Sequence, residues 1–421
     1  MASDLSGGVL TASWMQRPDV VAVLSALGAP EVDVRFVGGC VRDSILGRPV
    51  VDIDLATPDL PETVMKKASA AGLKVVPTGL SHGTVTVVSD GCGFEVTTLR
   101  KDTATDGRHA DVEFTTDWAE DAARRDFTFN AMSARADGKI FDIFGGHEDA
   151  NAGRVCFIGN PRDRIQEDYL RILRYFRFLA HYGKEPPSDE VLAVCQELRA
   201  GLAQLSIERI RDELTKLMSA LDPSRAISAM ICTSILEDVL PEAHAPDRFE
   251  RLIQKEKRVA FDISKAAWRR RLMFLIHEQA FATDEIRKRL KLSNADSKAL
   301  SQIQRAATDA ERAFDQPHRN RFLYAYEPEY SKDAVLIAWA RDPVSGEADW
   351  EILYQAAVDW KPKTFPLGGS DAKVLGLPEG PEVGKVLKRL EREWIDGGFL
   401  TTAQDLRRRM KELVEQAKSR P

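Results

Sequence analysis

The sequence has few cysteines and no long apolar run. Its five cysteines, in a chain of 421 residues, are scattered and never stand at Cys-x-x-Cys spacing, so neither a disulfide framework nor a zinc site is indicated. No segment approaches the roughly 18 consecutive apolar residues of a membrane span, and the first residues lack the basic start and apolar core of a secretory signal. We therefore expect a cytoplasmic protein without a membrane partner.

The chain also lacks a strong excess of charge, with 59 Lys and Arg against 65 Asp and Glu and a net charge of -6. This average argues against a nucleic-acid partner. The charge is uneven, however: residues 1–150 hold 14 basic and 23 acidic side chains, a net of -9, and the remaining 45 basic and 42 acidic side chains give +3. An acidic first part is thus followed by a slightly basic second part.

The apolar pattern predicts two regions of different fold class, a mixed α/β region followed by helices. Residues 101–116 are polar without a clear period and predict a mobile loop. From residue 163 the period is helical, beginning with one helix that Gly183 stops. Strands are expected at 32–39, 50–57, 74–76, 84–88 and 94–99; helices at 62–71, 118–132, 189–200, 206–220, 224–237, 247–257, 263–281, 283–291 and 295–314. We expect an α/β head (1–155), then an all-α neck (156–222), body (223–360) and tail (361–421).

Carboxylates in the head point to metal chemistry. Asp52 and Asp54 are two residues apart in a predicted strand, so both emerge from one face, where a divalent cation would relieve their repulsion. Glu95, in the strand GFEVTTLR, is the candidate third carboxylate. The alternative is that all three are ordinary acids on a solvent-facing strand edge.

A glycine turn lies just upstream of these aspartates. The segment GGCVRD places Gly38 and Gly39 between a strand and a short helix, where backbone N–H groups favour phosphate and Arg42 can join them. Magnesium is commonly held by carboxylates together with substrate phosphates, so the two predictions support each other.

The segment RFVGGCVRDSILGRPVVDIDLAT resembles the signature of the class II tRNA nucleotidyltransferase and poly(A) polymerase family, within the polymerase-β-like nucleotidyltransferases. The resemblance is dense from Arg35 to Leu214 and thin afterwards. Further motifs of that family follow in order: HGTVTVV, FEVTTLRKD, DAARRDFTFNAM, FGGHEDANAGRVCFIGNPRDRIQEDYLRILRYFRF and SIERIRDEL. It implies a nucleotidyltransferase head that transfers a nucleoside monophosphate from CTP or ATP to an RNA 3'-hydroxyl and releases pyrophosphate.

The resemblance also implies roles for individual residues of the head. Asp52 and Asp54 would hold two magnesium ions, and Gly38, Gly39 and Arg42 would lie along the triphosphate. In ARRDFTFNA, the ribose and triphosphate would be contacted by Arg124, Arg125, Asp126 and Asn130. The last two are four residues apart on the predicted helix 118–132. A structural salt bridge at a helix N-terminus is the alternative for Asp126.

The motif EDYLRILRYFRF is implied to select the base. Asp168 would accept a hydrogen bond from the exocyclic amine of cytosine or adenine, and Arg171 would donate a hydrogen bond to the neighbouring acceptor atom of the ring. Uracil and guanine carry a carbonyl there and would be repelled. Arg174 and Arg177 would hold phosphate or orient the first two. The alternative is an amphipathic helix with a solvated basic stripe. The resemblance also implies that the loop after the RKD motif takes part in the switch from C to A addition, so its presence favours complete CCA addition over addition of CC alone.

A basic tail is the predicted RNA-binding segment. Residues 361–421 contain 13 basic and 9 acidic side chains, and the candidate tRNA contacts are Lys385, Arg407, Arg408 and Arg409. The predicted function is template-independent addition of CCA to tRNA. A poly(A) polymerase and a partial CC- or A-adding enzyme are the enzymatic alternatives. A catalytically silent RNA-binding protein is disfavoured, because both aspartates and the glycine turn are retained.

Overall fold

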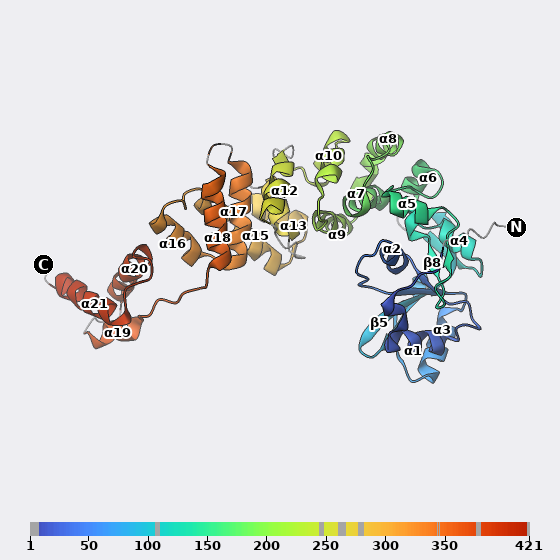
Figure 1. Ribbon diagram of the computed structural model, residues 1–421, viewed down its shortest axis with the longest axis horizontal. Coiled ribbons are helices and arrows are strands. Elements are labelled where there is room, and N and C mark those ends of the chain that lie inside the picture. Colours follow the sequence, from blue (N-terminus) through green and yellow to red (C-terminus); the bar gives the residue numbers. More distant parts are fainter. Residues whose placement is uncertain are drawn as a thin grey trace. The chain divides into compact units, whose positions relative to one another are not determined.

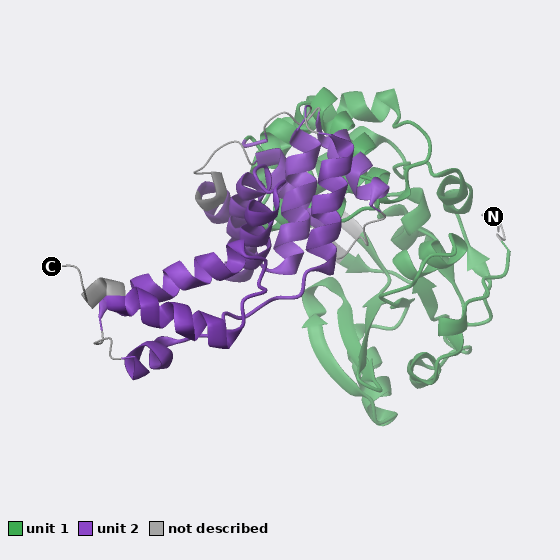
Figure 2. Ribbon diagram, turned by 60° about the vertical axis from the view of Figure 1, so that its left-hand side comes forward, with its two compact units in different colours: residues 1–241 green, residues 242–421 purple. Residues whose placement is uncertain are grey.

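The computed structural model describes residues 8–105, 110–243, 248–259, 267–276, 282–342, 344, 346–375 and 380–418. It divides into two compact units, residues 1–241 and 242–421, shown in green and purple in Figure 2. The predicted fold class, an α/β head followed by helices, is confirmed. The finer division into head, neck, body and tail stays a prediction. Among the described residues, no helix is long and apolar enough to cross a membrane.

Unit 1 contains one mixed sheet of seven strands. Its central pair, β2 and β5, is parallel, and the other neighbours are antiparallel. The buried side chains Val85 and Val87 alternate with less buried ones along β4, which packs against helices α1 (Pro18–Leu27) and α3 (Pro61–Ala70) (Figure 1). The order in the sheet is β3 (Lys74–Gly79), β4 (Thr84–Ser89), β5 (Cys92–Thr98), β2 (Asp54–Thr57), β1 (Arg35–Val37), β8 (Ser133–Ala134) and β9 (Ile140–Phe141).

The polar segment after β5 forms a second, two-stranded sheet. Strands β6 (Arg100–Thr105) and β7 (Ala110–Phe114) pair antiparallel with a register shift between Asp102 and Ala104. The prediction of a loop over 101–116 was therefore wrong for these strands, and 106–109 lie outside the described residues. A two-stranded ribbon is held together by backbone hydrogen bonds, which do not require alternating apolar side chains. The sequence therefore shows no apolar period that would predict it.

The helix predicted over 118–132 is shorter than expected. Helix α4 (Trp118–Ala123) ends before Arg124, and only a 3-10 turn, η3 (Thr128–Asn130), follows. Between them Phe127 is extended and bridges to Phe157, and its ring packs edge-on against Phe178 at 5.2 Å. Burial of this aromatic cluster outweighs the local preference for helix.

The single helix predicted from residue 163 is two helices. Helix α6 (Pro161–Glu167) ends at Asp168, whose backbone is extended at φ -156° and ψ 107°, and α7 (Leu170–Tyr182) begins two residues later. Helix α7 packs against α9 (Ile207–Met218) and α10 (Ser224–Cys232). The helix predicted over 224–237 is also divided, because Ser234 takes a left-handed conformation before α11 (Ile235–Val239). Helix α8 (Asp189–Leu198) and the 3-10 helix η4 (Arg199–Gln204) complete this part.

The described part of unit 2 is helical. Helix α20 packs against α16 through Trp394, whose ring lies 5.9 Å from that of Tyr324. Residues 361–368 form neither helix nor strand, as their prolines and glycines predict. The helices are α12 (Phe249–Arg258), α13 (Ala267–Ile276), α14 (Ala282–Arg289), α15 (Asn294–Ala310), α16 (Gln316–Ala325), α17 (Pro328–Arg341), α18 (Glu347–Asp359), α19 (Gly369–Val374), α20 (Pro381–Asp396) and α21 (Ala403–Lys418).

A buried ion cluster joins three of these helices. Glu256 of α12 accepts hydrogen bonds from Arg270 Nε at 2.8 Å and Arg271 Nη2 at 2.7 Å, and Arg270 also reaches Asp333 of α17. Arg270, Arg271 and Glu256 are each at most 3% exposed. Removing the central carboxylate would leave two buried cations undercompensated.

We expect Glu256→Gln to lower the free energy of unfolding of unit 2 by about 3 kcal/mol, because it breaks a buried ion cluster. Urea-induced unfolding, followed by circular dichroism, measures the loss. The matched control is Glu351→Gln, which removes the partner of Arg258 in an exposed ion pair and should leave the unfolding midpoint unchanged. Equal midpoints for the two variants would contradict the importance of the cluster.

Candidate active site

Unit 1 holds a polar cavity of about 480 Å³. It is bounded by the glycine turn before α2 (Gly39–Ile45), the start of β2, the segment after α4, and helices α7 and α9. Eleven predicted site residues line it: Gly38, Gly39, Arg42, Asp54, Arg124, Arg125, Asp126, Asn130, Asp168, Arg171 and Arg174. Asp52, Glu95 and Arg177 are not among its lining residues.

Two of the three predicted carboxylates lie side by side at the central pair of strands. Asp54 begins β2 and lies directly opposite Glu95 of β5 in the parallel register, so both side chains lie on the same face of the sheet. Asp52 precedes the strand rather than lying in it, and it is exposed. Burial and repulsion from Glu95 and Asp52 raise the pKa of Asp54 from 3.8 to about 6, against the opposing charge of Arg125.

This arrangement fits a divalent cation that is completed by substrate. Asp54 is a half-buried carboxylate whose ionised form is disfavoured by two acidic neighbours, and a nearby cation would remove that cost. In the part of the chain that the structure describes, no three Asp, Glu, His or Cys side chains converge closely enough to enclose a metal by themselves. Magnesium bound through one or two carboxylates and substrate phosphates needs no such cage.

The glycine turn brings backbone close to the arginines of the cavity. Gly38 has φ 68° and ψ -122°, a conformation that residues with a side chain rarely adopt. A Cβ at this position would lie 3.3 Å from Arg125 Nη1. The turn therefore favours glycine, and a larger residue would also require Arg125 to shift by a few tenths of an ångström.

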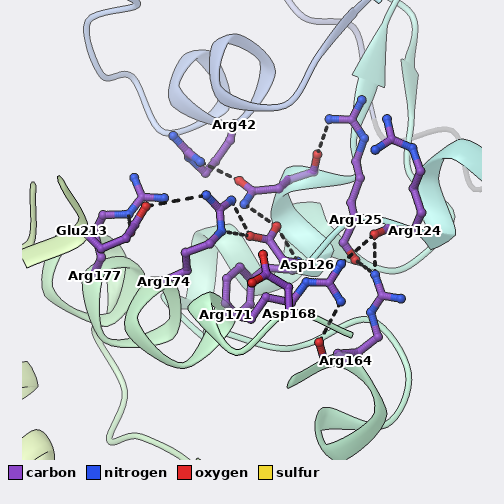
Figure 3. A network of polar contacts seen from close by, with 12 residues as sticks. Arg42, Arg124, Arg125, Asp126, Arg164, Asp168, Arg171, Arg174, Arg177 and Glu213 are labelled. Atoms are coloured by element: carbon purple, nitrogen blue, oxygen red, sulfur yellow. Dashed lines mark hydrogen bonds and ion pairs between the residues drawn. The ribbon is translucent and has the colours of Figure 1, made fainter. Parts of the chain in front are cut away.

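A chain of buried polar contacts runs from α2 to α7 (Figure 3). Arg42 Nη1 donates to Asn130 Oδ1 at 2.6 Å, and Asn130 Nδ2 donates to Asp126 Oδ1 at 3.0 Å. Arg174 Nε donates to the other oxygen of Asp126 at 2.6 Å. Asp126 and Asn130 therefore meet as predicted, although through a turn rather than along a helix.

These hydrogen bonds and the charge of Arg174 keep Asp126 ionised. Burial on its own would raise the pKa of Asp126, but the charge of Arg174 and the hydrogen bonds from Asn130 and Arg174 lower it below 3.8. The same groups contact opposite sides of one buried carboxylate. Asp126 thus links the 3-10 turn η3 to helix α7, which lines the cavity.

Arg124 and Arg125 share one partner that the sequence analysis missed. Asp121, which is buried in α4, accepts hydrogen bonds from Arg124 Nη2 at 2.8 Å and Arg125 Nη2 at 3.2 Å. Burial would raise the pKa of Asp121, but the two guanidinium charges lower it. Arg164 of α6 donates to the backbone carbonyls of both arginines. The acidic residue three and four positions before an arginine pair was the available signal.

Asp168 and Arg171 do not pair with each other. Arg209 Nη2 of α9 donates to Asp168 Oδ2 at 2.6 Å, while Asp168 Oδ1 accepts from the backbone of Leu170. Arg171 instead forms an ion pair with Glu167. The prediction of one helix carrying both residues was wrong, because the chain is extended at Asp168. Arg209 was missed as a site residue, although it lies in the quoted motif SIERIRDEL.

Arg177 lies behind the cavity rather than in it. Its Nε is 2.6 Å from Glu213 Oε2 of α9 in an ion pair, and Glu213 Oε1 is 3.9 Å from Arg174. Burial lowers the pKa of Arg177. Glu213 is the second residue of SIERIRDEL that the sequence analysis did not select. It joins Arg174 and Arg177 to α9.

The predicted tail contacts lie in unit 2, and each has an acidic partner. Lys385 pairs with Glu382 at 2.6 Å, and Arg407 pairs with Asp371 at 2.8 Å. The other two ion pairs are Arg408 with Asp405, at 2.7 Å, and Arg409 with Glu412, at 2.8 Å. RNA binding by these four residues stays a prediction.

Comparison with known proteins agrees with the geometry of unit 1. The Poly A polymerase head domain matches residues 34–156, and the probable RNA and SrmB-binding site of polymerase A matches residues 187–245. The chain is 33% identical over 386 residues to CCA tRNA nucleotidyltransferase 1, mitochondrial, of Homo sapiens, a match that covers 89% of this chain and 85% of the relative.

The chain belongs to the CCA tRNA nucleotidyltransferase family. A CCA-adding enzyme of Limosilactobacillus fermentum is 30% identical, with 93% of this chain and 96% of the relative covered. The crystal structure of the Bacillus stearothermophilus CCA-adding enzyme in complex with CTP is similar at a TM-score of 0.73 and 26% identity, covering 97% of this chain and 99% of that one. The family resemblance found in the motifs therefore extends over both units.

We expect the Asp54 carboxyl of the metal-free protein to titrate near pH 6, as its pKa indicates. Because this value lies above the unfolded one, the folded state loses stability as the pH rises from about 4 to 6. Carbon-13 NMR of labelled aspartate measures the titration, and Asp54→Asn identifies the signal. Glu95→Gln should lower the midpoint, which burial still keeps above 3.8. A midpoint that does not move in Glu95→Gln would contradict the electrostatic contact.

Proposed function

We propose that this chain adds C, C and A to the 3' end of tRNA, using CTP and ATP and releasing pyrophosphate. The observation that carries the proposal is the cavity of unit 1, which is lined by the Asp54 carboxylate, by several arginines and by the Asp168 carboxylate. The names of relatives that cover most of the chain support it. In the reaction the 3'-oxygen bonds to the α-phosphorus, the bond to pyrophosphate breaks, and the hydroxyl proton is released.

We propose that Asp52 and Asp54 hold two magnesium ions, with Glu95 keeping the local field negative. When bound, these ions would lower the pKa of the 3'-hydroxyl and neutralise the triphosphate. The chain itself supplies positioning: Arg42 and Arg125 both line the cavity beside the glycine turn, and their guanidinium groups would orient phosphate oxygens. Arg124 and Arg125 are held for this by Asp121.

Base selection is assigned to Asp168, assisted by Arg171 and Arg209. A carboxylate accepts the exocyclic amine of cytosine or adenine and repels the carbonyl of uracil or guanine. Arg209 occupies one oxygen of Asp168 at 2.6 Å and so fixes the direction of the carboxylate. Arg209 is a positioning residue in this proposal.

The cytoplasmic location also stays a proposal, since the human and mouse relatives are named as mitochondrial.

The assay of the proposed function uses tRNA that ends at the discriminator base, with magnesium and CTP, ATP or both. We expect two C additions followed by one A. Asp54→Asn should lower the rate by about 1,000-fold or more, because it removes a metal ligand worth several kcal/mol in the transition state. Product sequencing reads the result. Long A tails from ATP alone would identify a poly(A) polymerase, and stopping after two C residues would identify a CC-adding enzyme.

Asp168→Ala should lower the preference for CTP and ATP over UTP and GTP by about 10- to 100-fold, the value of one base contact. Competition between nucleotides in the tRNA assay measures this preference. Arg209→Gln should lose less selectivity, because the carboxylate remains but is less firmly oriented. Affinity for the triphosphate should change little in either variant. Unchanged selectivity in Asp168→Ala would remove this residue from base recognition.

A further inference from the structure

A second cavity, of about 290 Å³, lies beside α14 and α15 in unit 2. We call it the α15 cleft, defined by the cationic residues Arg287, Lys298 and Arg305 and the carboxamides Asn294 and Gln302. Two serines complete the lining, and none of the lining residues is acidic or aromatic. The side chains of the cleft are therefore polar groups of neutral or positive charge.

One face of α15 forms most of this cleft. Asn294, Lys298, Gln302 and Arg305 follow one another at steps of three or four residues, the spacing of neighbours on a helix surface. Arg287 reaches them from α14, where its Nη2 donates to Asn294 Oδ1 at 2.9 Å. That bond occupies the amide oxygen, so Asn294 has its N–H₂ group left to donate.

The hydroxyl groups of the cleft are already engaged. Ser297 Oγ donates to the carbonyl of Ser293 at 2.8 Å, and Ser301 Oγ donates to the carbonyl of Ser297 at 3.0 Å. The remaining donors are therefore ammonium, guanidinium and carboxamide N–H groups. A ligand for such a set must carry several acceptor oxygens and negative charge, which describes a phosphate group.

The electrostatic setting distinguishes the α15 cleft from the basic tail. Each predicted tail contact has a carboxylate beside it, which cancels much of the field that a phosphate would experience. Lys298 and Arg305 have no ion pair with any residue that the structure describes. The positive field of the cleft therefore remains available to a ligand.

We propose that the α15 cleft binds backbone phosphates of the RNA substrate. This inference rests on the proposed function, which makes tRNA that substrate. An RNA backbone is favoured over a free nucleotide, because the cleft has no aromatic side chain on which a base could stack. Contacts of this kind position an RNA without reading its sequence.

The test compares the double variant Lys298→Ala/Arg305→Ala with the unaltered chain in CCA addition. We expect KM for tRNA to rise about 10-fold with kcat unchanged, because two phosphate contacts are lost while the cavity of unit 1 is intact. The slope of log affinity against log salt concentration should fall by about one for each contact removed. The single variant Lys298→Arg should retain most of the affinity of the unaltered chain for tRNA, since it keeps the positive charge.

The matched control is Lys288→Ala/Arg312→Ala, which removes the same charge from exposed residues outside the cleft lining and should change KM for tRNA less than twofold. An unchanged KM for tRNA in the cleft variant, or an equal rise in the control, would overturn the proposal. A rise in KM for CTP instead would make the cleft a nucleotide site and overturn it as well. Failure of the unaltered chain to add CCA would contradict the proposed function itself.

Discussion

The buried carboxylate of Asp126 is the interaction on which the architecture of the cavity depends. It accepts from Asn130 on one side and Arg174 on the other, so one charge joins the turn of the head to helix α7. Arg42 is placed through Asn130, and Glu213 of α9 lies next to Arg174. A buried charge is stable only when it is fully paired, and each of these partners is therefore constrained in position.

The motifs predicted most of the cavity because they are short and local. Asp54 and the glycine turn are determined by a strand, a tight turn and a helix that follow one another in sequence. The parallel pairing that places Glu95 beside Asp54 joins residues far apart in the chain, and no spacing rule predicts it. Helix predictions failed where tertiary contacts outweighed propensity, at buried Phe127 and at the extended Asp168.

The partners of the predicted residues were harder to find. Arg209 and Glu213 have no unusual local pattern, and each becomes significant only when folding brings an opposite charge to it. In unit 2 the reverse holds, because a run of three arginines stands out in the sequence while the structure places carboxylates beside them. A count of charges along the sequence does not show which basic side chains are neutralised by an acidic neighbour in the folded protein.

Because β2 pairs directly with β5, the relative position of the Asp54 and Glu95 carboxylates does not depend on how many residues connect the two strands. The register of the sheet fixes Asp54 opposite Glu95, and the β4 to β5 hairpin turns at Asp90 and Gly91, several residues before Glu95. Residues added at that turn would extend the rim of the sheet without altering the distance between the two acids. This fold can therefore vary its outer surface among relatives while it preserves one carboxylate geometry.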